Sequence, residues 1–314
     1  MVEPILRADV EREPRPVLGY AMVWTAALLF AVNGTVSKVI LESGVSSLRL
    51  TQVRSTGAFV LLAVAIAVLA PRTLRVTRRE LPFLVAFGVV ALAFVQWLYF
   101  VSIHRLPVGI ALLLQYLAPL LVALWARYVM HEMVRRRIWG ALALALTGLA
   151  LVVEVWEGLS LDGVGVAAAL AAAVAYAVYV LMAERAVSRR DPFSLSLYGF
   201  LFAALFWALV QPPWTFPAGD FDDQASLLGN LADTELPVWA LTAWLVTLGT
   251  IAPFGLVVWA LRHIPATRVG IIAMLEPVAA TLVAFAWLDE RLDPAQLAGG
   301  AVVLAGIVLA QTAR

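Results

Sequence analysis

The sequence contains no cysteine and only 3 histidines, and charged residues make up 14% of its 314 positions. The lack of cysteine excludes disulfides, thiolate metal sites and cysteine nucleophiles. The histidines all fall near predicted helix ends, which argues against a metal cluster. A phosphate-binding glycine loop, a GxSxG motif and an HExxH motif are also missing. We therefore expect neither an enzyme nor a bound metal or cofactor.

Apolar residues, in contrast, are in large excess: 63% of the chain is hydrophobic and the mean hydropathy is +0.92. A soluble chain of this length needs far more polar surface, whereas lipid solvates an apolar outer face. The composition is therefore typical of a multi-pass membrane protein. The net charge of +1 gives no indication of a nucleic-acid partner.

Long apolar runs divide the chain into segments of about 20 residues, the length that crosses a bilayer as a helix. Strands of a membrane barrel would instead alternate over about 10 residues. We predict an all-α integral membrane fold with ten transmembrane helices. Their ranges are 20–41, 48–70, 82–103, 107–129, 136–154, 163–185, 193–211, 238–261, 265–288 and 294–312.

The basic residues of the loops are divided unequally between the two sides of this topology, 17 on one side and 4 on the other. Because cytoplasmic loops carry the excess of Lys and Arg, both termini are predicted to be cytoplasmic, in an inner membrane. Residues 1–19 then form a cytoplasmic tail. Loop 212–237 has no basic residue and falls outside; its acidic residues are Asp220, Asp222, Asp223, Asp233 and Glu235.

One stretch of the sequence occurs twice. Residues 98–132 match residues 256–290 without a gap, at an offset of 158, so that Pro119 meets Pro277. We interpret this as a duplicated five-helix unit, 20–154 and 163–312, although two runs rich in Leu, Ala and Val also show chance similarity. Because five is odd, the second unit is inverted in the membrane, an architecture typical of secondary transporters.

The repeated stretch and the C-terminal segment also carry a family resemblance. The residues concerned are SIHRLPVGIALLLQYLAPLLVAL at 102–124, ALRHIPATRVGIIAMLEPVAATLVAF at 260–285 and LDERLDPAQLAGGAVVLAGIVLA at 288–310. With them the chain resembles the EamA-like family of the drug/metabolite transporter superfamily. The resemblance implies ten helices, two inverted repeats and a carrier for small metabolites. The sequences of both proline-containing segments most resemble those of bacterial exporters of threonine and homoserine or of aromatic amino acids.

Pro119 and Pro277 lie about half-way along their predicted helices. A proline inside a helix removes a backbone hydrogen bond and produces a kink. In a membrane, the freed carbonyl is tolerated only where protein or a water-filled cavity satisfies it. The two prolines are therefore candidate hinges beside a central cavity, or alternatively static packing kinks.

Glu276, directly before Pro277, is the most informative polar residue. A carboxylate near the bilayer centre is costly unless it is paired, protonated or in water, so it indicates a functional site. It would bind the ammonium group of a substrate or take up a proton. The alternative is a structural carboxylate bonded to a neighbouring helix.

Neutral polar side chains on other helices complete the predicted binding site. Amides and phenols offer donors and acceptors without net charge, as a zwitterionic or small polar ligand requires. The same residue types also join membrane helices to one another. They are Asn33 on the first predicted helix, Gln96 and Tyr99 on the third, Gln115 and Tyr116 on the fourth, and Tyr176 and Tyr179 on the sixth.

Arg54, within the second predicted helix, is a candidate charge partner. Its side chain would snorkel to the outer surface, pair with Glu42 or attract a substrate carboxylate. We favour snorkelling or pairing.

Together these features predict a secondary carrier that exports amino acids or related small metabolites by alternating access through a central cavity. The predicted partners are the small-molecule substrate, protons and the lipid bilayer. Three alternatives stay open: a multidrug exporter of cationic compounds, a non-transporting scaffold or lipid-carrier subunit, and a channel. A channel is disfavoured because no row of like polar residues lines one helix.

Overall fold

The computed structural model describes residues 15–69, 74–105, 108–152, 162–215, 218–289 and 294–312, most of which are helical. Eight of the helical segments are long and apolar enough to cross a membrane. The chain is therefore a multi-pass membrane protein, as predicted. Of the predicted tail 1–19, residues 1–14 lie outside the described residues. The first helix begins at Pro16, not at residue 20, since proline suits the first position of a helix.

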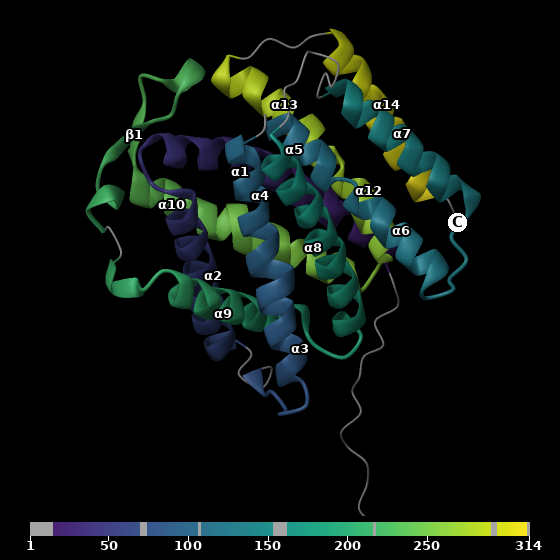
Figure 1. Cartoon of the computed structure of the whole chain (residues 1–314), viewed down its shortest axis with the longest axis horizontal. Coiled ribbons are helices and arrows are strands. Elements are labelled where there is room, and N and C mark those ends of the chain that lie inside the picture. Colours follow the sequence, from purple (N-terminus) through teal and green to yellow (C-terminus); the bar gives the residue numbers. More distant parts are fainter. Residues whose placement is uncertain are drawn as a thin grey trace, which may run out of the picture.

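The two halves of the chain repeat one order of helices and interruptions (Figure 1). The elements of the first half are α1 (Pro16–Glu42), α2 (Ser47–Leu69), α3 (Leu81–Ala86), η2 (Phe87–Ala93), α4 (Phe94–Arg105), α5 (Val108–Gln115), α6 (Ala118–Tyr128) and α7 (Arg136–Val152). The helical elements of the second half are α8 (Gly163–Val187), α9 (Pro192–Val210), α10 (Val238–Val246), η6 (Thr247–Ile251), α11 (Ala252–Ala260), α12 (Ala266–Ala273), α13 (Leu275–Leu288) and α14 (Pro294–Thr312).

The interruptions fall at matching places in the two halves. The π-helical segments η2 and η6, in which the helix is locally widened, end at Ala93 and Ile251. The helices α5 and α12 end at Gln115 and Ala273. Each of these two pairs is separated by 158 residues, the offset of the sequence repeat. A repeated sequence therefore produces a repeated local structure.

The halves are interleaved. Helix α1 packs against α11, α12 and α13 of the second half, and α8 packs against α4, α5 and α6 of the first. Two further pairs join equivalent helices of the halves: α2 lies against α9, and α7 lies against α14 at the upper right of Figure 1. Neither half has a separate core, because the main buried cluster takes residues from both.

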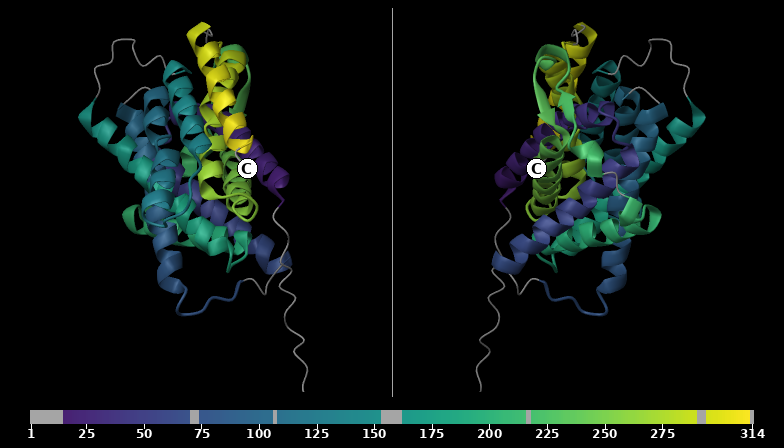
Figure 2. Two further views of the ribbon diagram at one scale, coloured as in Figure 1. Left: turned by 90° about the vertical axis from the view of Figure 1, so that its right-hand side faces the viewer. Right: turned by 90° about the vertical axis from the view of Figure 1, so that its left-hand side faces the viewer.

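The segment between α9 and α10 contains the strands β1 (Gln224–Ser226) and β2 (Glu235–Pro237), which form an antiparallel hairpin. Short 3-10 turns accompany it: η3 (Pro213–Thr215), η4 (Ala218–Phe221) and η5 (Gly229–Leu231). The fold is predominantly helical, as predicted, but the segment 212–237, predicted as a loop, contains this hairpin. It lies between spans, where water can hydrogen-bond strand edges. Ala225 and Leu227 are buried, and Trp287 of α13 donates its indole N–H to the carbonyl of Leu227 at 2.7 Å. The side views of Figure 2 show the hairpin beside α13.

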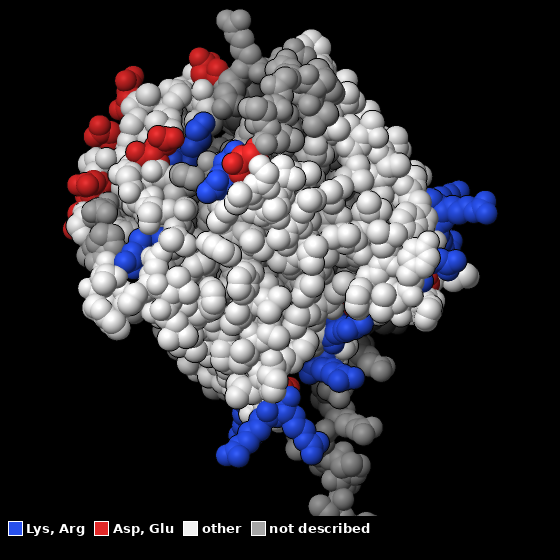
Figure 3. All heavy atoms as spheres, viewed as in Figure 1, with Lys and Arg blue, Asp and Glu red and all other residues white. Residues whose placement is uncertain are grey.

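The surface separates charge from apolar area. In Figure 3 the acidic side chains gather at the hairpin, while most Lys and Arg lie at the lower and right-hand rims and a largely uncharged surface lies between. On the outer face of α2, the side chains of Val60, Val64 and Val68 are 48%, 60% and 74% exposed. They recur every four residues and form one stripe. Such a stripe is suited to contact with lipid.

Glycines allow α7 and α14 to approach closely. A Cβ added at Gly148 would lie 2.6 Å from the backbone nitrogen of Val303, and one at Gly299 would lie 2.6 Å from the Gly148 carbonyl oxygen. Backbone atoms cannot move aside as a flexible side chain does. Close contact through small residues is a common way of packing membrane helices.

We expect Gly148→Ala to destabilise the protein by about 1–3 kcal/mol, because the added methyl overpacks this contact. Gly140→Ala is the matched control on the same helix, since its Cβ would meet nothing nearer than 3.6 Å. The control should be neutral or slightly stabilising, because Ala favours helix over Gly. Thermal unfolding of both variants in detergent tests this; equal losses in the two would contradict the close contact.

Candidate functional site

The candidate site lies where two helices are broken. A proline cannot donate to the carbonyl four residues before it. For Pro119 that carbonyl belongs to Gln115, and for Pro277 it belongs to Ala273, and these are the last residues of α5 and α12. The predicted helices 107–129 and 265–288, each expected to kink at its proline, are therefore each divided into two helices within the described residues. Both prolines lie in the first turn of the second helix, where a helix N–H has no intrahelical partner.

Glu276 is the second residue of α13, directly after one of these breaks. The hydroxyl of Tyr116, from the other break, donates to its Oε2 atom at 2.6 Å. Tyr116 is buried and Glu276 is half-buried. The N-terminus of a helix also favours a negative charge. This hydrogen bond thus joins one residue from each half of the chain.

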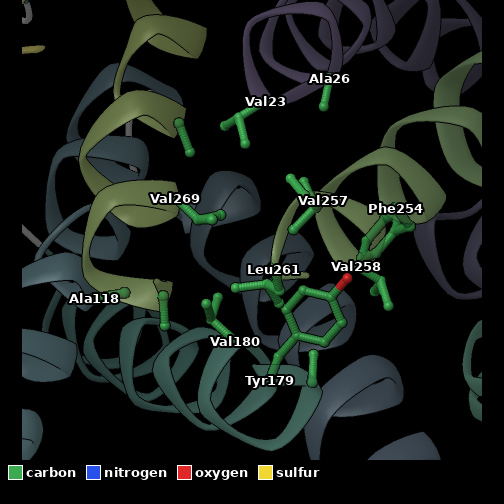
Figure 4. Packing of buried hydrophobic residues seen from close by; sticks show 14 of the residues in the cluster. Val23, Ala26, Ala118, Tyr179, Val180, Phe254, Val257, Val258, Leu261 and Val269 are labelled. Atoms are coloured by element: carbon green, nitrogen blue, oxygen red, sulfur yellow. The ribbon is translucent and has the colours of Figure 1, made fainter. Parts of the chain in front are cut away.

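Two further tyrosines lie near the bond, and a third stacks on one of them. Tyr99 and Tyr176 interact electrostatically with Glu276. Tyr176 stacks on Tyr179 with ring centroids 6.0 Å apart, and Tyr179 meets Phe254 edge-on at 5.7 Å. Figure 4 shows the Tyr179 ring between α8 and α11, with its hydroxyl oxygen directed towards α11. The side chains therefore combine apolar faces with polar tips.

Arg54 of α2 points into the bundle and is only 6% exposed, so the prediction that it snorkels is wrong. Its Nε donates to Thr250 Oγ1 at 2.7 Å and its Nη2 to the Gly249 carbonyl at 3.1 Å. The guanidinium also lies 5.7 Å from the centre of the Phe254 ring. Buried hydrogen-bond acceptors and an aromatic face hold it inside. The predicted pairing with Glu42 is not formed among the described residues.

Thr250 and the Gly249 carbonyl were not predicted as site groups. The signal for them is Pro253, four residues after Gly249. This proline has no N–H to donate to the Gly249 carbonyl, which accepts from Arg54 instead. A third proline therefore prepares an acceptor for the buried arginine.

The predicted amides have buried polar atoms that form no hydrogen bond to any described residue. Within the described part of the chain, Asn33 Oδ1, Gln115 Oε1 and both amide atoms of Gln96 have no hydrogen-bond partner. Asn33 borders Gly249, since a Cβ added there would collide with Asn33 Oδ1. An unsatisfied buried polar group costs about 1–3 kcal/mol. These amides are therefore suited to a polar ligand, but among the described residues no hydrogen bond joins Gln96 or Gln115 to Glu276.

The described residues contain no group of three or more His, Asp and Glu side chains that could hold a metal ion. The chemistry available at the site is therefore that of one carboxylate, one guanidinium, phenols and amides. These groups can bind a polar molecule and can exchange a proton at Glu276.

Comparison with known proteins identifies the family of this chain. Residues 17–154 and again residues 163–312 match the EamA-like transporter family. The threonine/homoserine exporter RhtA of Escherichia coli (strain K12) is 30% identical over 273 residues, which cover 86% of this chain and 82% of that protein. The uncharacterized transporter YwfM of Bacillus subtilis (strain 168) is 25% identical over 296 residues, 93% of each chain. A protein of known crystal structure at 19% identity shares the fold, with a TM-score of 0.74 over 94% of this chain and 99% of that one. The chain therefore belongs to the EamA-like transporter family.

Proposed function

We propose that this protein is a secondary carrier of the inner membrane that exports an amino acid or related small metabolite by alternating access. The observation that carries the proposal is the Glu276 carboxylate, which lies at a helix break inside the bundle and accepts a bond from Tyr116 of the other half. A charge at such a place is retained where it serves a ligand or a proton. The 30% identity to a threonine/homoserine exporter supports an amino acid as the cargo.

The substrate site lies between the halves. The ammonium group of the substrate binds Glu276 at the carboxylate oxygen that Tyr116 leaves free, and the polar and aromatic side chains around it contact the rest of the molecule. These residues are Asn33, Gln96, Tyr99, Gln115, Tyr176 and Tyr179. Glu276 also binds a proton, and this proton is released when the ammonium group of a substrate arrives.

The chain crosses the membrane ten times as two inverted five-helix repeats, 20–154 and 163–312, with both termini in the cytoplasm. The matched interruptions support the duplication, and the pairing of α2 with α9 and of α7 with α14 supports a two-fold relation. Helices α7 and α14 have 17 and 19 residues. At 1.5 Å per residue they are about 25–29 Å long, close to the thickness of a hydrocarbon core.

Alternating access requires contacts that close one side and can break. On the side predicted to be cytoplasmic, Glu184 of α8 accepts a hydrogen bond from the backbone N–H of Ala266 at 2.7 Å. Arg268 of α12 donates to the Tyr20 hydroxyl of α1 at 2.7 Å. Opening towards the cytoplasm breaks these bonds, and the half-helices on either side of Pro119 and Pro277 supply the hinges.

Arg54 distinguishes the amino-acid exporter from an exporter of cationic drugs. A site for lipophilic cations is served by Glu276 and the aromatic rings alone. The buried guanidinium, which interacts electrostatically with Glu276, repels a ligand that carries only positive charge. We therefore prefer an amino-acid exporter over an exporter of cationic drugs.

We expect Glu276→Gln to lower amino-acid efflux from proteoliposomes by roughly 100-fold, because it removes a buried charged partner. It should also remove any dependence of the remaining efflux on pH. Glu235→Gln, on the exposed hairpin, is the control and should match wild type. Labelled amino acids are loaded into the liposomes and followed over a pH series.

Two results would count against this proposal. Efflux of a cationic dye without efflux of any amino acid would favour the drug exporter. Unchanged efflux by Glu276→Gln at every pH would show that the carboxylate takes part in neither substrate binding nor proton transfer.

The absence of cysteine allows the topology to be tested with single cysteines. Asp233→Cys, exposed on the hairpin, should react with a membrane-impermeant thiol reagent in spheroplasts with intact membranes. Arg78→Cys, exposed before α3, should react only after permeabilisation. Labelling of both positions from the same side would contradict the predicted topology.

A further inference from the structure

Two opposite charges in the described part of the chain, Arg54 and Glu276, lie inside the bundle without forming an ion pair with each other. Arg54 interacts electrostatically with Glu276 and with Tyr99. Among the described residues, no ion pair joins Arg54 or Glu276 to any other side chain. A buried ion pair that was purely structural would bring the two groups into contact, because only close geometry compensates for lost hydration.

The bonds of Arg54 leave its charge without a counter-ion. Thr250 and Gly249 supply a hydroxyl and a carbonyl, both neutral acceptors, through Nε and Nη2. They fix the position of the planar guanidinium, and Phe254 supports one face of it. A guanidinium held in this way is suited to bind a carboxylate through a charge-assisted hydrogen bond.

Glu276 has the complementary arrangement. Tyr116 donates to Oε2, and no hydrogen bond from the described residues reaches the other carboxylate oxygen. The Tyr116 hydroxyl holds the carboxylate, and the first turn of α13, in which Glu276 lies, favours its negative charge. A substrate ammonium group supplies the donors and the positive charge that this oxygen lacks.

We propose that the substrate is bound as an α-amino acid zwitterion, with its carboxylate on the guanidinium of Arg54 and its ammonium group on the carboxylate of Glu276. This inference rests on the proposed function and specifies the substrate class of the same site. It explains why both charges stay in the bundle without pairing, because the ligand bridges them. An amine without the carboxylate leaves Arg54 unpaired, and a hydroxy acid without the amine leaves Glu276 unpaired, so both are rejected.

The test compares threonine with its decarboxylated counterpart 1-aminopropan-2-ol and its deaminated counterpart 2,3-dihydroxybutanoate. Uptake by wild-type proteoliposomes should favour threonine over either by roughly 100-fold or more in kcat/KM. Arg54→Gln should lower kcat/KM for threonine by roughly 100-fold and bring it to within a few-fold of that for the amine. Arg54→Lys, which keeps the charge but not the planar fork, should fall between and still favour threonine.

Arg49→Gln is the matched control, because Arg49 lies on the same helix and its side chain bonds only to Gln52 and Thr215 among the described residues. It should leave the preference for threonine unchanged. Retention of the wild-type preference by Arg54→Gln would overturn the inference. Equal uptake of threonine and the amine by the wild-type protein would also overturn the inference. This measurement needs no variant, so it remains possible even if Arg54→Gln does not fold. Lack of uptake of every amino acid by wild type would instead overturn the proposed function itself.

Discussion

A carboxylate inside an apolar helix bundle is the constraint on which the rest of the site depends. The charge is costly there unless its surroundings stabilise it. The first turn of α13 provides the positive end of a helix, and Tyr116 provides a hydroxyl at 2.6 Å. Both exist because the helices are broken at this depth, so the breaks and the charge must be understood together.

Three prolines produce the arrangement by one physical rule. Each proline leaves the carbonyl four residues before it without a hydrogen-bond donor. At Pro119 and Pro277 the consequence is a helix end, which creates two facing half-helices. At Pro253 the consequence is an acceptor for Arg54. Non-helical backbone in a membrane requires such compensation by protein groups, and here that compensation positions both charges of the site.

Features that depend on local sequence and on the bilayer could be predicted from the chain alone. They include the apolar segments, the repeat and the position of Glu276 beside Pro277, since length and spacing determine them. The inward direction of Arg54 could not, because it depends on acceptors almost 200 residues away in the sequence. The hairpin over α13 was missed for the same reason: its short strands are stabilised by Trp287, a contact that no local pattern indicates. The sequence places Tyr116 three residues before one proline and Glu276 directly before the other, but their hydrogen bond depends on the fold.

The opposite signs of Arg54 and Glu276 have an electrical consequence. Moving one elementary charge through 100 mV involves about 2.3 kcal/mol of work. A site with one positive and one negative group, holding a ligand that also has one of each, has no net charge. Under the proposed alternating-access mechanism, reorientation of this site is therefore insensitive to the membrane voltage, and a concentration gradient alone sets the direction of flow. A proton on Glu276 changes this, because the empty site then returns with one positive charge and the voltage acts on it.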